Sequence, residues 1–249
     1  MAFKKPTLKT TQEGDFNFDP LLEVGTYKAR IYQVVDLGLQ PGSRDYPDPK
    51  HKLEIGFELL EECKVDKDGN EVAGVPATFT MDVAYQPDGY MHEKSALFKL
   101  YQAIDPACEI GPDEFLGKLC EVMLIQKKRK SGKNAGKDYS AVSAVLPMKA
   151  KDQAKLADAG TLETLFFDLS EPLLDTWAKL TKGYSFAQQD RIRAGLEYGL
   201  SPLPELLGEE ANGADPEPKA GAQEPAQAGT EPPVTGADES SEDEDDPFA

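Results

Sequence analysis

The chain has 249 residues and carries 27 Lys and Arg residues against 45 Asp and Glu residues, a formal net charge of −18 at pH 7. A charge of this sign, spread evenly, would oppose binding to a polyanion. The acidity is instead concentrated at one end, because residues 209–249 contain 13 acidic residues and a single lysine, and so contribute −12. The first 208 residues contribute only −6, and their chemistry is therefore assessed separately.

Several classes of protein are excluded at once. No stretch approaches the roughly 20 apolar residues that a membrane-spanning helix needs. The N-terminus carries Lys4 and Lys5 but no apolar run behind them, so we expect neither a signal peptide nor contact with a membrane. Cys63, Cys108 and Cys120 are odd in number and scattered, which favours reduced thiols in the cytoplasm over a disulfide framework.

The first half of the chain shows the pattern of β-strands. After an N-terminal arm over residues 1–25, the segment 27–35 is rich in β-branched and aromatic residues and predicts a strand. Apolar side chains alternate with polar ones over residues 53–59, as they do in a half-buried strand. A turn cluster of Asp, Gly and Asn at 66–70 follows, and a third alternating segment covers residues 78–83.

The periodicity then changes to that of a helix. Apolar residues recur at helical spacing over 97–104, and Asp105-Pro106 ends the run. Residues 119–126 and 139–146 predict two further strands. Three strands, a helix and two strands are the order of the five-stranded Greek-key barrel known as the OB-fold, although other small α+β folds share it. We therefore predict a mainly β, OB-fold-like barrel over residues 26–148.

The remainder of the chain divides into two parts. Residues 149–207 carry short apolar stripes with capping signals, and we expect a small helical extension that packs on the barrel or on itself. Residues 208–249 are dominated by Ala, Pro, Gly, Glu and Asp. Such a segment buries too little apolar surface to offset the entropy of ordering, so we expect a disordered acidic tail.

The most distinctive local feature is a basic loop between the fourth and fifth predicted strands. Residues 127–137 contain six bases and no acid: Lys127, Lys128, Arg129, Lys130, Lys133 and Lys137. Lysine and arginine side chains placed against phosphates release condensed counterions, which favours nucleic-acid binding. The alternative is a hairpin tip kept in water by its charges. The loop is not a Walker A motif, because its glycine spacing is one residue short and Asp138 replaces Ser or Thr.

An OB barrel binds single strands by combining a basic groove with aromatic side chains on which bases stack. Lys28, Arg30 and Tyr32 share one face of the first strand, which we expect to be the outer, binding face. A second cluster of basic and aromatic residues follows this strand along the chain. The candidate groove residues outside the basic loop are Lys28, Arg30, Tyr32, Arg44, Lys50, Lys52, Tyr85, Tyr90 and Tyr139. Each tyrosine, taken alone, is also compatible with a core or rim position.

Catalytic and metal-binding patterns are weak. The two histidines, His51 and His92, lie far apart in the sequence and fit surface positions, and no CxxC pair is present. No Ser/His/Asp arrangement or HExxH motif occurs. We therefore expect no enzyme activity, no metal site and no cofactor.

The acidic C-terminal tip provides a resemblance to a known family. Asp243, Glu244, Asp245 and Asp246 stand directly before Pro247-Phe248. This arrangement resembles the tip of bacterial and phage single-stranded-DNA-binding proteins, and residues 25–38 and 116–118 are similar to a phage-encoded group of them. The resemblance implies that the tip docks on replication, recombination and repair proteins. One departure is that Ala249 follows the phenylalanine, which displaces the terminal carboxylate.

These features together predict a sequence-independent protein that coats and protects single-stranded DNA during replication or recombination. Its acidic tail would recruit partners and compete with DNA for the basic loop. A phage-encoded protein of this kind would work in the cytoplasm of the host cell. The alternatives are an acidic protein-interaction module that mimics DNA and, after it, a replication-associated nuclease. The sequence leaves open whether the chain forms a homo-oligomer and whether it also binds RNA.

Overall fold

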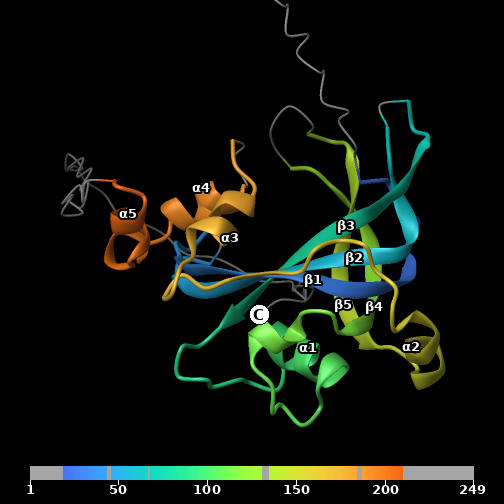
Figure 1. The fold of residues 1–249 in the computed structure, drawn as a ribbon, viewed down its shortest axis with the longest axis horizontal. Coiled ribbons are helices and arrows are strands. Elements are labelled where there is room, and N and C mark those ends of the chain that lie inside the picture. Colours follow the sequence, from blue (N-terminus) through green and yellow to red (C-terminus); the bar gives the residue numbers. More distant parts are fainter. Residues whose placement is uncertain (1–18, 44–45, 67, 131–134, 184–186, 210–249) are drawn as a thin grey trace, which may run out of the picture.

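The computed structural model describes residues 19–43, 46–66, 68–130, 135–183 and 187–209, and Figure 1 shows their arrangement. Five long strands dominate this part of the chain. They are β1 (Gly25–Gln40), β2 (Lys50–Val65), β3 (Glu71–Tyr85), β4 (Leu119–Lys128) and β5 (Asp138–Pro147). Helix α1 (Ala96–Ile104) and a short 3-10 helix, η1 (Pro112–Phe115), lie between β3 and β4. The predicted order of three strands, a helix and two strands is confirmed.

The strands form one antiparallel sheet in the order β3-β2-β1-β4-β5. A short sixth strand, β6 (Leu165–Phe167), pairs with β1 in parallel. Within the described residues no hydrogen-bonded ladder joins β3 to β5, so the prediction of a closed barrel is wrong at this seam. The structure therefore establishes a mainly β fold, a six-stranded sheet that is antiparallel except for β6.

The seam is occupied by other parts of the chain. Helix α1 packs against both β3 and β5. At another point the segment before β1 spans the gap, because the Thr78 backbone N–H donates to the Asp19 carboxylate at 2.8 Å and the Leu22 N–H donates to Ser140 Oγ at 2.9 Å. One backbone N–H of β3 and one side-chain hydroxyl of β5 are thus bonded to this segment without a ladder between the two strands. Residues 19–24 are consequently a packed part of the fold rather than a free arm.

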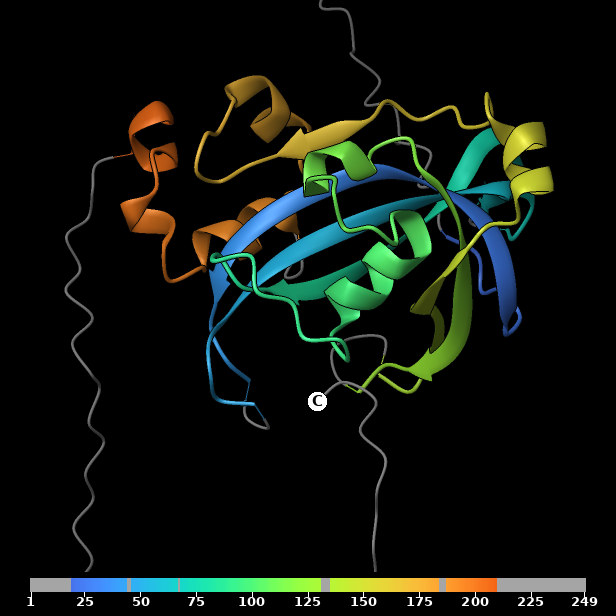
Figure 2. The same ribbon diagram turned by 90° about the horizontal axis from the view of Figure 1, so that it is seen from below.

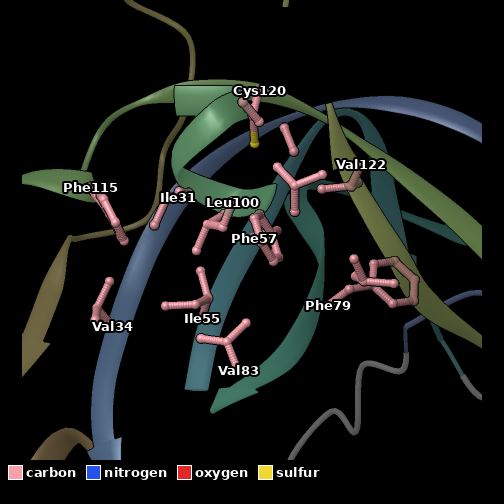
Figure 3. Packing of buried hydrophobic residues seen from close by; sticks show 14 of the residues in the cluster. Ile31, Val34, Ile55, Phe57, Phe79, Val83, Leu100, Phe115, Cys120 and Val122 are labelled. Carbon is pink, nitrogen blue, oxygen red and sulfur yellow. The ribbon is translucent and has the colours of Figure 1, made fainter. Parts of the chain in front are cut away.

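The curved sheet encloses the main core on its inner face, as Figure 3 shows. Ala29 and Ile31 of β1 point into this core together with Phe57 of β2. An irregularity in the pairing of β1 with β2 follows Ile31, and such bulges change which side chains face inward. After it, Val34 lies in the main core, whereas Val35 and Leu37 lie in a second core on the other face. Strand β1 is therefore buried on both faces along its second half.

The second core is completed by residues 149–209, which run along one side of the molecule in Figure 2. This extension contains α2 (Ala150–Leu156), β6, α3 (Leu174–Lys179), α4 (Gln188–Arg193), a 3-10 helix η2 (Tyr198–Leu200) and α5 (Leu203–Leu206). Its larger apolar contributions to the second core are Leu165, Phe167, Leu169, Trp177, Leu180, Ile192 and Leu203. The helices were expected from the sequence, and the strand β6 was not. No helix of the described residues is long and apolar enough to span a membrane.

Candidate nucleic-acid interface

The basic loop is the turn of the β4–β5 hairpin, which points to the top of the view in Figure 1. Its base is a regular ladder, in which Lys127 pairs with Tyr139 and Lys128 with Asp138. The Arg129 N–H donates to the Lys137 carbonyl at 3.0 Å, and the Gly136 N–H donates to the Arg129 carbonyl at 2.8 Å. Gly136 has a φ of +82°, a conformation that side chains disfavour. These bonds hold the flanks of the loop in place.

The hairpin carries more positive charge than its own acid can neutralise. The side chain of Lys128 is 75% exposed and lies 3.7 Å from Asp138, an ion pair that screening by water makes weak. No ion pair is made by Lys130 or Lys137, which are both exposed, within the described residues. Lys133 and Ser131 lie outside the described residues. The flanks of the turn therefore present Lys128, Arg129, Lys130 and Lys137 beside the single acid Asp138.

Tyr139 lies beside these cations. Its ring is half-buried on β5, and the guanidinium carbon of Arg129 is 4.8 Å from the ring centre. A cation over an aromatic face is attracted by the ring quadrupole, so the pair orders both side chains. The hairpin thus places its cations beside one half-buried aromatic ring, and nucleic-acid binding by these residues stays a prediction.

Arg30 occupies a different environment from the one predicted. Its guanidinium donates to Glu58 Oε2 at 2.5 Å and to the Leu162 carbonyl at 2.6 Å. The side chains of Arg30 and Glu58 are only 15% and 1% exposed. Thr161 covers the pair, because its N–H donates to Glu58 Oε1 at 2.6 Å. Gly160 leaves room for the guanidinium, since a Cβ there would lie 2.3 Å from Arg30 Nε. Arg30 therefore neutralises a buried carboxylate and is not free to meet a phosphate.

Tyr32 lies on the same covered face. Its ring packs over Gly56, where an added Cβ would lie 3.0 Å from the ring. Burial, together with the nearby carboxylates of Glu54 and Asp19, raises the pKa of Tyr32 to about 12. Glu54 is itself buried and accepts from Gln188 and Arg191 of α4. Burial raises the pKa of Glu54, against the opposing effect of these donors. The outer face around Arg30, Glu58 and Glu54 is therefore an internal, carboxylate-rich interface with the extension.

The other predicted groove residues are dispersed. Lys28 is ion-paired with Glu61 at 2.8 Å on an exposed part of the sheet. Lys52 lies on β2, two residues from Lys50. Lys50, Tyr85 and Tyr90 do come together, because all three line one pocket where β2 begins and β3 ends. Arg44 lies outside the described residues, as do the residues of the acidic tip from Asp243 to Phe248.

Tyr85 is fixed in this pocket by Asp36. The Tyr85 hydroxyl donates to Asp36 Oδ1 at 3.0 Å. Burial raises the pKa of Asp36, although the Gly38 N–H and the Tyr85 hydroxyl act in the opposite direction. Burial and the negative charge of Asp36 raise the pKa of Tyr85 well above 10. The phenol therefore remains a hydrogen-bond donor at neutral pH, and its ring keeps one orientation.

The structure also brings together residues that the sequence did not connect. His51 and His92 are the only two histidines of the chain, and both line the same pocket as Tyr85 and Tyr90. They are 41 positions apart, and only the register of β2 with β3, in which His51 pairs with Tyr85, connects them. A second unpredicted feature is the cover over Arg30, which comes from residues about 130 positions away.

Among the described residues, no group of three or more His, Cys, Asp or Glu side chains is placed to hold a metal ion. Comparison with known proteins adds no assignment: no protein-family model matches the chain, and no curated protein matches its sequence. The candidate interface therefore rests on the geometry of two places, the β4–β5 hairpin and the pocket at the start of β2.

Proposed function

We propose that this chain is a sequence-independent single-stranded-DNA-binding protein with an OB-fold-like body, and that it coats and protects exposed strands during replication or recombination. The observation that carries the proposal is the β4–β5 hairpin, where Arg129 lies over the Tyr139 ring and the exposed Lys128, Lys130 and Lys137 face one exposed, weakly paired acid. Other cations of the sheet, such as Arg30, are used internally. The hairpin is thus a place where several exposed positive charges, close together in the chain, remain available to a ligand.

The chemistry of the hairpin fits a single strand. Lysine and arginine side chains neutralise successive phosphates, and the affinity gained depends on salt but not on sequence. A base that stacks on Tyr139 adds affinity through a face that every base possesses. Arg129, which lies over this ring, can turn from the ring to a phosphate when a base takes its place. No step of this binding requires a metal or a cofactor.

The acidic tail completes the proposal. Its tip, Asp243 to Phe248, would bind replication, recombination or repair proteins, and its 13 acids from residue 209 onward would compete with DNA for the hairpin. An unstructured chain of this length would have a root-mean-square reach of about 35 Å. Both roles rest on charge and on the resemblance of the tip, since residues 210–249 lie outside the described residues.

A fluorescence-anisotropy titration with oligo(dT), repeated over a range of salt, tests the proposal. The triple variant Lys128→Ala, Lys130→Ala, Lys137→Ala removes three hairpin charges. Its control is Lys149→Ala, Lys151→Ala, Lys155→Ala, which removes three exposed lysines around α2. We expect salt-dependent binding by the wild type. The plot of log K against log salt should become shallower in the hairpin variant. The magnitude of its slope should decrease by about 0.7 for each phosphate that the variant no longer neutralises. The control should retain the wild-type slope.

Two results would reject the proposal. The first is no binding of oligo(dT) at any salt, with or without residues 210–249. The second is equal loss of binding in the hairpin variant and in the α2 control, because the effect would then report only net charge. Double-stranded DNA of the same length should bind more weakly, and strand cleavage in the presence of Mg²⁺ would point to a nuclease instead.

A further inference from the structure

The pocket at the start of β2 is formed by two chain segments that meet through the β2–β3 pairing. Lys50 and His51 begin β2, and Tyr85 ends β3. The chain from β3 to α1 supplies the opposite wall with Tyr90 and His92. The complete lining is Pro49, Lys50, His51, Ala84, Tyr85, Gln86, Tyr90, Met91, His92, Ser95 and Leu97. Four rings and one lysine are thus gathered around a single small cavity.

Two of the four rings, those of Tyr85 and His51, are held in one orientation by contacts with carboxylates. The Tyr85 hydroxyl is bonded to Asp36. His51 Nε2 lies 3.0 Å from both carboxylate oxygens of Glu197, which belongs to the extension. The ring centres of His51 and Tyr85 are 5.4 Å apart with an interplanar angle of 53°. A wall fixed in this way loses little entropy when it contacts a flat ligand, which favours binding.

The other side of the pocket is open and unpartnered. Tyr90 is 64% exposed, which leaves a large aromatic surface in water. The Nδ1 atom of His92 accepts from the Lys94 N–H at 3.1 Å, so its Nε2 is left for a ligand. Lys50 is exposed and makes no ion pair within the described residues. An aromatic surface beside a free cation suits a ligand that is planar at one end and anionic at the other.

We infer that this pocket binds one nucleotide of a single strand, with the base against Tyr90 and the Tyr85–His51 wall and the phosphate at Lys50. The inference rests on the proposed function. It assigns the binding of single-stranded DNA to two places, the β4–β5 hairpin and this pocket. In Figure 1 the β4–β5 hairpin points to the top, whereas the chain from β3 to α1 runs along the lower left. A short strand can occupy one place at a time. A longer strand occupies both, and the second contact then forms at high effective concentration.

The test compares oligo(dT) of increasing length on the full chain carrying Tyr90→Ala, Tyr90→Phe or Tyr46→Ala. Tyr46 is the matched control, because it is 47% exposed in the β1–β2 loop and does not line the pocket. For Tyr90→Ala we expect about tenfold weaker binding of long oligonucleotides and an unchanged salt slope, since stacking of a base contributes little charge dependence. Tyr90→Phe and Tyr46→Ala should bind as the wild type does.

Photo-cross-linking locates the contact directly. An oligo(dT) that carries one 5-iodouracil should cross-link to peptides containing residues 86–94 as well as to the hairpin, and Lys50→Ala should reduce the first product. If Tyr90→Ala binds like Tyr46→Ala and cross-links form only at the hairpin, the pocket is no nucleotide site while the proposed function stands. If the wild type binds no oligo(dT), the proposed function fails and the inference fails with it.

Discussion

Arg129 and Tyr139 form a cation–aromatic pair at the base of the basic hairpin, with 4.8 Å between the guanidinium carbon and the ring centre. The two residues come from opposite sides of the turn, and the ladder of β4 and β5 sets their spacing. A base and the guanidinium compete for the same ring face, so binding of DNA should change the neighbours of both side chains.

This pair gives the first prediction. Tyr139→Leu removes the ring and should weaken oligo(dT) binding by about tenfold, because one stacked base contributes on the order of 1–3 kcal/mol. Tyr139→Phe keeps the ring and should bind as the wild type does. Anisotropy titrations at one salt concentration measure both. Equal affinity of the leucine and phenylalanine variants would show that no base stacks at this position.

The second prediction concerns Arg30. Arg30→Ala leaves Glu58 buried without its cation, and removal of one partner of a buried pair costs about 3–5 kcal/mol. The control is Lys28→Ala on the same strand, whose partner Glu61 is exposed and whose loss should leave stability close to that of the wild type. Urea unfolding followed by circular dichroism measures both. If Arg30→Ala kept the stability of the wild type but lost affinity for DNA, Arg30 would be a DNA-binding residue and the prediction would be contradicted.

The third prediction is a pH dependence of stability with opposite signs at two glutamates. Burial alone would raise the pKa of Glu58, but hydrogen bonds from Thr161 and Arg30 outweigh it and hold the pKa below 4.5. Glu58 therefore contributes stability that is present above pH 4.5 and is lost as the pH falls through its folded-state pKa. Because Gln cannot titrate, Glu58→Gln should lose less stability than the wild type on acidification in this range, from a lower starting value at neutral pH.

Glu54 provides the comparison. Burial raises its pKa above 4.5, so the folded state takes up a proton before the unfolded state does as the pH falls. Between the folded-state pKa of Glu54 and pH 4.5, the variant Glu54→Gln should therefore lose stability more steeply than the wild type as the pH falls. Urea unfolding at a series of pH values measures both variants. Parallel pH profiles for wild type and both variants would contradict the assignments.

The fourth prediction concerns the acidic tail. Deletion of residues 210–249 should tighten oligo(dT) binding several-fold at low salt, and the gain should shrink as salt screens the competition. The deletion should begin after Glu209, because this residue accepts hydrogen bonds from Arg193 and Tyr198 of the body. A full-length variant with Asp243, Glu244, Asp245 and Asp246 changed to Asn or Gln separates charge from length. If the deletion bound no tighter at any salt, competition by the tail would be rejected.

Much of the sheet could be predicted from the sequence because its signals are local. Alternation over residues 53–59 and 78–83 reports one buried face, and the structure confirms Phe57 and Phe79 in the core. The basic hairpin was equally visible, since its charges lie within 11 consecutive residues. The same alternation in β1 located Arg30 and Tyr32 on the outer face. It could not show that residues 160–162 and α4 cover this face, because their contacts join positions more than 100 residues apart.

The pocket was missed for a related reason. His51 and His92 are separated by most of two strands, and only the pairing register brings their segments together. A sequence pattern reports which face a residue occupies, but it does not report which distant residue lies opposite. The strand β6 was missed because three residues are too few for alternation to be distinguished from an apolar helical run.

The parallel pairing of β6 with β1 has a consequence for synthesis on the ribosome. Residues 33–35 find their partners at residues 165–167, roughly 130 positions later in the chain. At translation rates of about 5–20 residues per second, this interval lasts on the order of 10 s. During that time the side chains of Val35 and Leu37, which the extension later buries, have no partner within the nascent chain. We therefore expect the exposed second half of β1 to favour aggregation of the nascent chain in this interval, and slower translation of residues 149–209 to lower the yield of folded protein.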